Sequence, residues 1–164
     1  ILMIIFHKFI DLIIVTLFFW ILGVMSVKFT RFVPHIGVET ISAGAIFIGY
    51  VYSWEIALIF GFVCGMYAYI QISLFNRMSL LNAMFMGLCG VFGTLFKQLG
   101  YGFQMAFIFS FVLRATLSFP LFMTVNPDPI ENTVHAVGDP LFNVVIVMQM
   151  LTVMFKILQW IKGG

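Results

Sequence analysis

The chain has 164 residues, of which 63% are hydrophobic and only 9% are charged, and its formal net charge is +2. Soluble domains carry about 45 to 50% apolar and about 25% charged residues, so this composition excludes an ordinary soluble fold and indicates a chain that lies in a lipid bilayer. The few scattered cations also exclude a nucleic-acid partner, because such an interface needs clustered Lys and Arg. Cys64 and Cys89 lie in apolar segments without a CxxC spacing, and we expect buried thiols.

Six apolar segments of spanning or near-spanning length fill the sequence. They cover roughly residues 9–27, 39–53, 56–73, 80–96, 103–123 and 141–160. A helix needs about 20 residues to cross the hydrocarbon core, and these segments do not alternate as the strands of a barrel do. We therefore predict an all-α, polytopic bundle of about six transmembrane helices that forms one domain over residues 1–164.

Small residues mark the helices that we expect to pack closely. The segment 39–53 is short and rich in Gly, Ala and Ser, the segment 56–73 carries Gly61 and Gly65, and the segment 80–96 carries glycines at 87, 90 and 93. Such stripes let helix backbones approach one another in a membrane. We expect these three segments to pack against neighbouring helices.

The even number of spans places both termini on one side of the membrane. That side holds Lys8, Lys97, Lys156 and Lys162, and the other side holds Lys28, Arg31 and Arg77. The positive-inside rule therefore favours cytoplasmic termini in a multi-pass protein of the cell membrane. Because the sequence begins at Ile1, we expect the natural product to begin upstream.

Arg114 falls close to the middle of the fifth segment. A guanidinium at that depth costs a few kcal/mol on insertion scales, so it is expected to face the bundle interior and to have a partner. One interpretation is a contact with a substrate anion or carboxylate, which the planar fork can bind in a bidentate manner. The other is a structural ion pair, a carbonyl-bonded Arg or one that snorkels to the interface.

Residues 126–140 form the longest polar segment, and we predict a loop there because prolines at 127, 129 and 140 interrupt regular structure. Asp128, Glu131, His135 and Asp139 follow one another at offsets of three, four and four, so a helical turn would place them on one face. Carboxylates and an imidazole can bind a divalent metal or polarise a substrate. A metal site, a substrate lid and a plain solvated loop are the three interpretations.

Three further polar residues stand at the starts of spans on the side of that loop: Glu39, Asn82 and Asn143. They either cap or pack helices or contact a ligand. The candidate substrate-binding set is Glu39, Asn82, Arg114, Asn132, His135, Asp139 and Asn143.

Catalytic motifs are absent from the sequence. There is no HExxH, no GxSxG and no phosphate-binding loop, and the histidines at 7, 35 and 135 lie in different segments. We therefore expect neither an enzyme nor a bound cofactor. A metal-dependent membrane enzyme that uses the four residues of the polar segment is a minor alternative.

The segment from Ile48 to Glu55 joins a short, Gly-rich helix to the next helix through a tight turn, and Gly61 and Gly65 follow. This arrangement, with Asn143 opening the last helix, resembles the substrate-binding S components of energy-coupling factor transporters and the related MreD proteins. The resemblance covers the whole chain in the number and length of the spans.

The resemblance implies a six-helix subunit for the uptake of a micronutrient, either a vitamin or a metal, with cytoplasmic termini and a pocket toward the outside. Loops from Lys28 to Val38, from Phe75 to Ser79 and from Thr124 to Asp139 would roof this pocket. It also implies membrane-protein partners, namely a coupling protein and paired ATPases. The first span lacks the small-residue pairs with which S components meet that coupling protein, so a non-catalytic scaffold role, as in MreD-like proteins, is the alternative.

Overall fold

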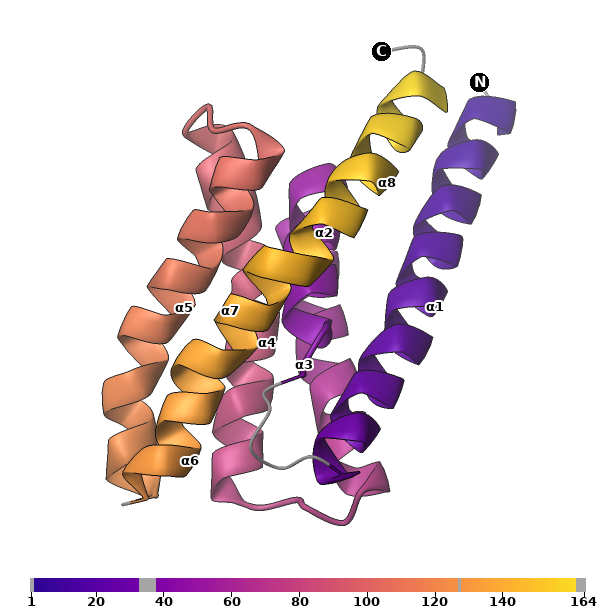
Figure 1. Cartoon of the computed structure of the whole chain (residues 1–164). Coiled ribbons are helices and arrows are strands. Elements are labelled where there is room, and N and C mark those ends of the chain that lie inside the picture. The colour runs from indigo at the N-terminus through magenta and orange to yellow at the C-terminus, as the bar shows by residue number, and fades with distance from the viewer. Residues whose placement is uncertain (1, 33–37, 127, 162–164) are drawn as a thin grey trace.

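The protein is a bundle of antiparallel helices (Figure 1). The computed structural model describes the backbone of residues 2–32, 38–126 and 128–161, and within these ranges it describes the side chains except those of residues 2–8, 30–32, 131, 134 and 135. Every regular element in this part of the chain is a helix, with no strand. The predicted all-α fold class is confirmed.

Five helices precede a long, composite sixth one. They are α1 (Leu2–Phe32), α2 (Ile41–Val51), α3 (Trp54–Gln71), α4 (Arg77–Gln98) and α5 (Phe103–Val125). The sixth consists of α6 (Pro129–Thr133), the π-helical turn η1 (Val134–Gly138), α7 (Asp139–Phe142), the π-helical turn η2 (Asn143–Val147) and α8 (Met148–Ile161). Among the described residues, all of these helices except α2 provide segments long and apolar enough to cross a membrane, five in total. The chain is therefore built as a multi-pass membrane protein.

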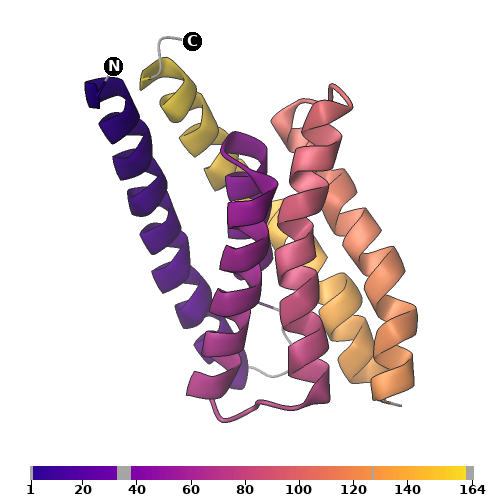
Figure 2. The same ribbon diagram turned by 180° about the vertical axis from the view of Figure 1, so that it is seen from behind.

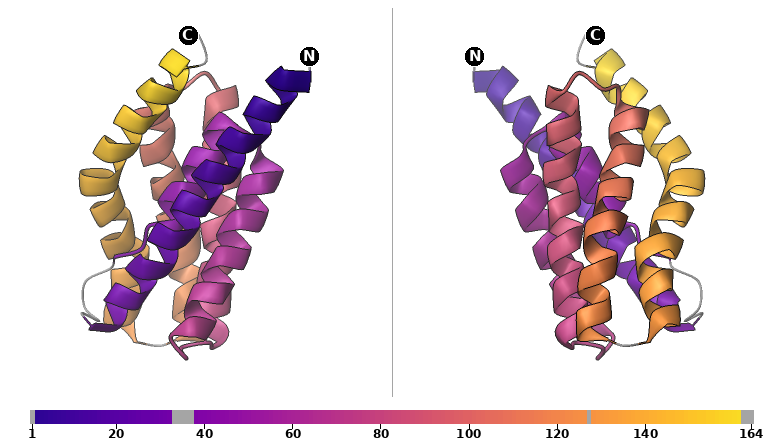
Figure 3. Two further views of the ribbon diagram at one scale, coloured as in Figure 1. Left: turned by 90° about the vertical axis from the view of Figure 1, so that its right-hand side faces the viewer. Right: turned by 90° about the vertical axis from the view of Figure 1, so that its left-hand side faces the viewer.

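The chain ends of the first and last helices lie at the same end of the bundle (Figure 1). The C-terminal end of α1, the connection between α3 and α4 and the C-terminal end of α5 lie at the opposite end, which we call the loop end. Seen from behind, α3 and α4 run side by side (Figure 2). The side views show α1 crossing the bundle obliquely (Figure 3).

Polar side chains fix two of the helix starts. Ser53 precedes α3, and its hydroxyl accepts a hydrogen bond from the Ile56 amide at 3.3 Å. Asn76 and Ser79 form a reciprocal capping box at the start of α4: the Ser79 amide donates to Asn76 Oδ1 at 2.8 Å, and the Asn76 amide donates to Ser79 Oγ at 2.7 Å. These bonds satisfy backbone N–H groups that have no partner within the helix.

Glycines bring α4 close to both α2 and α3. A Cβ atom on Gly61 of α3 would lie 2.6 Å from the Met86 carbonyl oxygen, and one on Gly87 of α4 would lie 2.7 Å from the Leu58 carbonyl oxygen. A Cβ on Gly49 of α2 would clash with the carbonyl group of Gly90. The three helices therefore touch backbone to backbone, as the stripes of small residues predict.

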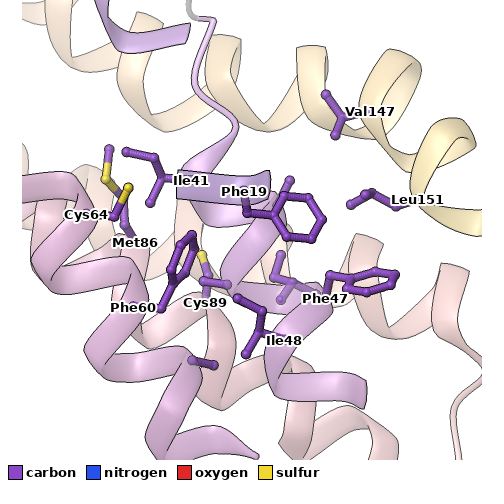
Figure 4. Close-up of a cluster of buried hydrophobic side chains, with 14 of the residues drawn as sticks. Phe19, Ile41, Phe47, Ile48, Phe60, Cys64, Met86, Cys89, Val147 and Leu151 are labelled. Atoms are coloured by element: carbon purple, nitrogen blue, oxygen red, sulfur yellow. The ribbon is translucent and has the colours of Figure 1, made fainter. Parts of the chain in front are cut away.

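The apolar core lies around α2, whose residues from Ile41 to Tyr50 are all buried. Phe19 of α1, Met86 of α4 and Leu151 of α8 belong to the same cluster of buried side chains as Phe47 of α2 (Figure 4). An 11-residue helix is too short to span the hydrocarbon by itself. Its enclosure by the other helices explains how it is accommodated.

The structure differs from the sequence expectation over residues 126–140, where a loop was predicted and a helix begins at Pro129. Pro129 stands at the first position of α6, where a missing N–H costs nothing. Asp128 Oδ1 accepts the Ile130 amide at 2.9 Å and so holds the start of the helix. Pro140 follows the π-helical turn η1, in which the i to i−4 pattern that proline interrupts is already replaced. The prolines therefore reshape the helix locally and do not end it.

Candidate functional site

Arg114 projects from the middle of α5 into the bundle and has no exposed surface. Ser110 and Ser118, one turn before and one turn after it, are also fully buried. Residues four apart lie on one helix face, so the two small side chains leave room for the long one between them. Ser110 bonds back to the Ala106 carbonyl of its own helix at 2.7 Å, as serines in transmembrane helices often do.

The guanidinium of Arg114 connects four parts of the chain. Nη1 donates to Ser42 Oγ at 2.8 Å and to Glu39 Oε2 at 3.2 Å. Nη2 donates to Asn82 Oδ1 at 2.8 Å and lies 3.7 Å from Asp139 Oδ2. We call Glu39, Ser42, Asn82, Arg114 and Asp139, with Tyr69 and Asn143 described below, the Arg114 network.

Glu39 precedes α2 and closes its first turn. Its carboxylate accepts the Ser42 amide at 2.8 Å and the Ser42 hydroxyl at 2.7 Å. The next residue, Thr40, donates from its amide and its hydroxyl to Ser26 Oγ of α1, both at 3.1 Å. These bonds anchor the start of α2 inside the bundle, and they explain how a carboxylate at the start of a helix reaches a guanidinium in mid-span.

Asn82 extends the network toward α3. Its side-chain amide donates to the Tyr69 hydroxyl at 2.6 Å while its carbonyl accepts from Arg114. An amide that both donates and accepts transmits the polarisation of one bond to the next. Tyr69 is therefore a member of the site that the sequence expectation missed.

The turn of helix that contains Asp139 and Asn143 closes the network on the side of the sixth helix. Asn143 Nδ2 donates to the Asp139 carbonyl oxygen at 2.8 Å and also to the backbone carbonyl oxygen of Glu39. Asp139 is 2% exposed and Asn143 is fully buried. The two residues lie one turn apart across the junction of α7 and η2, so both reach the same place.

Five of the seven predicted site residues thus come together: Glu39, Asn82, Arg114, Asp139 and Asn143. Asn132 is buried, but its amide donates to the Asn126 carbonyl oxygen at 2.6 Å and fastens α6 to the end of α5. His135 lies in η1, and its side chain is outside the described part of the structure. Ser42 and Tyr69 are the members that the sequence expectation did not include.

Ser42 carries one signal in the sequence, because it follows Glu39 at the capping distance of three residues. Tyr69 carries a weaker signal, a phenol near the end of an apolar span, where tyrosine is also common as an interface anchor. Neither signal distinguishes a network member from an ordinary cap or anchor. Only the contacts in the folded structure identify Ser42 and Tyr69 as members of the network.

Two of the four candidate metal ligands, Asp128 and Asp139, have side chains that the structure describes, and these two lie in different surroundings. Asp128 is exposed at the start of α6, whereas Asp139 is buried beside Arg114. Among the residues that the structure describes, no three His, Cys, Asp or Glu side chains are placed to hold one ion.

Several buried polar atoms around the network have no hydrogen-bond partner. They are Arg114 Nε, Ser118 Oγ, Asn143 Oδ1 and, nearer the loop end, Asn132 Oδ1. An unsatisfied buried donor or acceptor costs about 1–3 kcal/mol, and more when the group is charged. Around the network and toward the loop end, one donor, one hydroxyl and two acceptors are therefore unsatisfied among the described residues.

An open hollow of about 510 Å³ lies on the sixth helix. It is lined by Pro129, Ile130, Thr133, Val137 and Gly138, so it ends one residue before Asp139. Most of its lining is apolar. It lies nearer the loop end of the bundle than the Arg114 network.

Comparison of this chain with protein-family models, with curated proteins and with solved structures finds no match. The resemblance to S components therefore rests on the number of spans and on the motif from Ile48 to Glu55.

Proposed function

We propose that this chain is an integral-membrane binding subunit for the uptake of a small, polar micronutrient, and that the Arg114 network is its binding site. The observation that carries the proposal is the burial of one guanidinium and two carboxylates at the centre of an apolar bundle. Ionisable residues inside a membrane are costly and generally mark a substrate or ion pathway.

Stability alone is a weak reason for such a network. Buried ion pairs often contribute no more to stability than apolar residues of the same volume would, because desolvation offsets their attraction. The glycine contacts hold α2, α3 and α4 together without Arg114. A role in recognition accounts better for the charges.

The position of the network supports an entrance at the loop end. Asn82 lies in the second turn of α4, counted from that end, and Glu39 lies between the loop-end terminus of α1 and the start of α2. In S components the pocket opens on the side of the first, third and fifth loops, and in this chain the C-terminal ends of α1 and α5 and the connection between α3 and α4 lie at the loop end (Figure 1). With cytoplasmic termini in the cell membrane, this entrance faces the outside.

The charges of the network favour a zwitterionic solute. Both Nη atoms of Arg114 already donate to protein oxygens, so a purely anionic ligand would have to displace Glu39 or Asp139. A zwitterion offers a carboxylate to Arg114 and a cationic group to the carboxylate that it displaces. The unpartnered atoms Arg114 Nε, Ser118 Oγ and Asn143 Oδ1 then become satisfied.

Two serines of α5 give a matched test of this site. Ser118 has an unpartnered hydroxyl, whereas Ser110 bonds to its own helix. Native mass spectrometry of the protein purified from its native membrane should detect a bound small molecule in the wild type and in Ser110→Ala. Ser118→Ala should reduce its occupancy about tenfold, as expected for the loss of one buried hydrogen bond. Equal occupancy in both variants, or no bound molecule in the wild type, would refute the site.

A second function, a non-catalytic scaffold subunit of a larger membrane assembly, is favoured by a different feature of the same network. Each Nη atom of Arg114 is engaged by the protein itself, so the network also works as a structural tie between α2, α4, α5 and α7. This role predicts a stable complex with unrelated membrane subunits in mild detergent and an empty site. A monomeric particle that carries a small molecule would count decisively against it.

A further inference from the structure

Helix α8 has a polar stripe that the binding function does not use. Gln149, Thr152, Lys156 and Gln159 follow one another at offsets of three, four and three. This is the spacing of a seam along one side of a helix. Three of the four side chains, those of Gln149, Lys156 and Gln159, are exposed.

The stripe is distinct from the face that α8 turns toward the core. Met148 and Leu151 are buried, and the Phe155 ring stacks on Phe103 of α5 at 5.1 Å between ring centres. Thr152 stands at the border of the two faces, where its hydroxyl accepts a hydrogen bond from the side-chain amide of Gln104 in α5 at 3.4 Å. The polar stripe therefore runs along the side of α8 next to the first turn of α5.

Lipid is a poor neighbour for this stripe. Gln149 lies near the middle of the candidate membrane span Ala136–Ile161, at the depth where the surrounding medium offers no hydrogen bonds. The other exposed side of α8 carries Met150 at 45% and Ile157 at 52% exposure, which suit acyl chains. Amide side chains in membrane helices usually bond across to another helix.

We propose that the stripe docks a transmembrane helix of a different protein, and that this helix carries a carboxylate opposite Lys156 and a polar side chain opposite Gln149. The partner is inferred to be acidic because the positive charge of Lys156 needs a negative charge opposite it. The Lys156 ammonium has no carboxylate partner among the described residues, and both described ion pairs belong to Arg114. A helix pair with offsets of three and four crosses at about +20°, the common geometry in membranes.

A second copy of this chain does not fit the stripe. Two copies related by a two-fold axis along the membrane normal would place equal depths of the two α8 helices against each other. Lys156 would then face Lys156, and two like charges at close range repel each other. A carboxylate-bearing partner removes this repulsion, and the same argument predicts no homodimer through α8.

The test uses a photo-reactive residue in the native membrane. Gln149→p-benzoylphenylalanine places the probe on the stripe, and Met150→p-benzoylphenylalanine, at the same depth but about 100° further around the helix, is the matched control on the lipid side. After irradiation, the expected product at position 149 is a crosslink to a transmembrane peptide of another protein that contains Asp or Glu. The control position should give at most about one tenth of that yield, because a specific helix contact excludes the opposite face.

Substitutions of Lys156 test whether its positive charge contributes to partner binding. With the probe at position 149, Lys156→Met should lower the crosslink yield about tenfold and Lys156→Arg should retain it, because only the second keeps the cation. All of these positions are exposed, so the variants are expected to fold, which their thermal unfolding in detergent will check. Crosslinks to lipid alone, crosslinks to a second copy of this chain, or a yield that does not depend on Lys156 would each overturn the proposal.

Discussion

Arg114 and Glu39 are 75 positions apart in the sequence, and their side chains form a buried ion pair at 3.2 Å between Nη1 and Oε2. The pair joins the middle of α5 to the start of α2. Because α2 begins deep inside the bundle, a carboxylate at a helix start and a cation in mid-span reach the same depth. This relationship defines the centre of the proposed site.

Breaking the pair from one side is expected to be costly. Arg114→Met leaves two buried carboxylates without their cation and should lower the free energy of unfolding by about 3–5 kcal/mol. The double variant Arg114→Met with Glu39→Gln should lose less than the sum of the two single changes, because the residues share one interaction. Reversible denaturation in detergent measures both values.

The control for this cycle is Arg77→Met, since Arg77 is exposed at the start of α4. Its cost should stay within about 1 kcal/mol, as for most exposed charges. Additive effects of Arg114→Met and Glu39→Gln would show that the two side chains are not coupled.

The Tyr69 hydroxyl is expected to contribute to the stability of the bundle through the Asn82 side chain. Tyr69→Phe removes the acceptor of the Asn82 amide and leaves a buried N–H group unpaired, which should cost about 1–3 kcal/mol. Tyr67→Phe on the same helix is the matched control, because Tyr67 is 42% exposed. Thermal unfolding of the two variants compares them, and equal stability would place Tyr69 outside the network.

The backbone contact between α2 and α4 is expected to reject any side chain at Gly49. Gly49→Ala would drive a methyl group into the Gly90 carbonyl, and such overpacking typically costs about 1–3 kcal/mol or more. Gly102→Ala meets nothing within 4 Å and should change stability by less than about 1 kcal/mol. A Gly49→Ala protein as stable as Gly102→Ala would contradict this packing.

The sequence alone predicts much of this fold. The bounds of α3, α4 and α5 follow from uninterrupted apolar runs, with caps or glycines at their ends. The sixth helix starts earlier than predicted, because Pro129 and Pro140 look like breaks whereas a helix start and a π-helical turn accommodate them. The presence of a proline in the sequence does not tell whether the preceding turn is π-helical or a break in the helix.

The site was predictable in its charged part and less so in its neutral part. A mid-span Arg114 requires partners, and Glu39, Asn82 and Asn143 lie on the correct side to supply them. Asn132 is also an asparagine in the polar segment on that side, but its side-chain amide bonds to the end of α5 instead. Which amide joins the network depends on the rotation of the sixth helix, and the two π-helical turns alter that rotation in a way that sequence periodicity cannot reveal.

Asn143 should hold the sixth helix to the rest of the bundle. Asn143→Leu removes the donor to the Glu39 and Asp139 carbonyl groups, so the amides of η1 and α7 should exchange with solvent faster. Val145→Ala, at an exposed position two residues further along η2, should leave this exchange unchanged. Hydrogen exchange with mass spectrometry measures both, and equal protection would show that Asn143 does not anchor the helix.

The most direct test of the central claim is a density map of the protein, purified from its native membrane into a lipid nanodisc, at a resolution that shows ordered water. If the Arg114 network is a binding site, density that belongs to neither protein nor water will lie within hydrogen-bonding distance of Arg114 Nε and Ser118 Oγ, the atoms without a protein partner. A map in which these two atoms face only protein and water, with the network closed on itself, would contradict the proposal and favour the scaffold role.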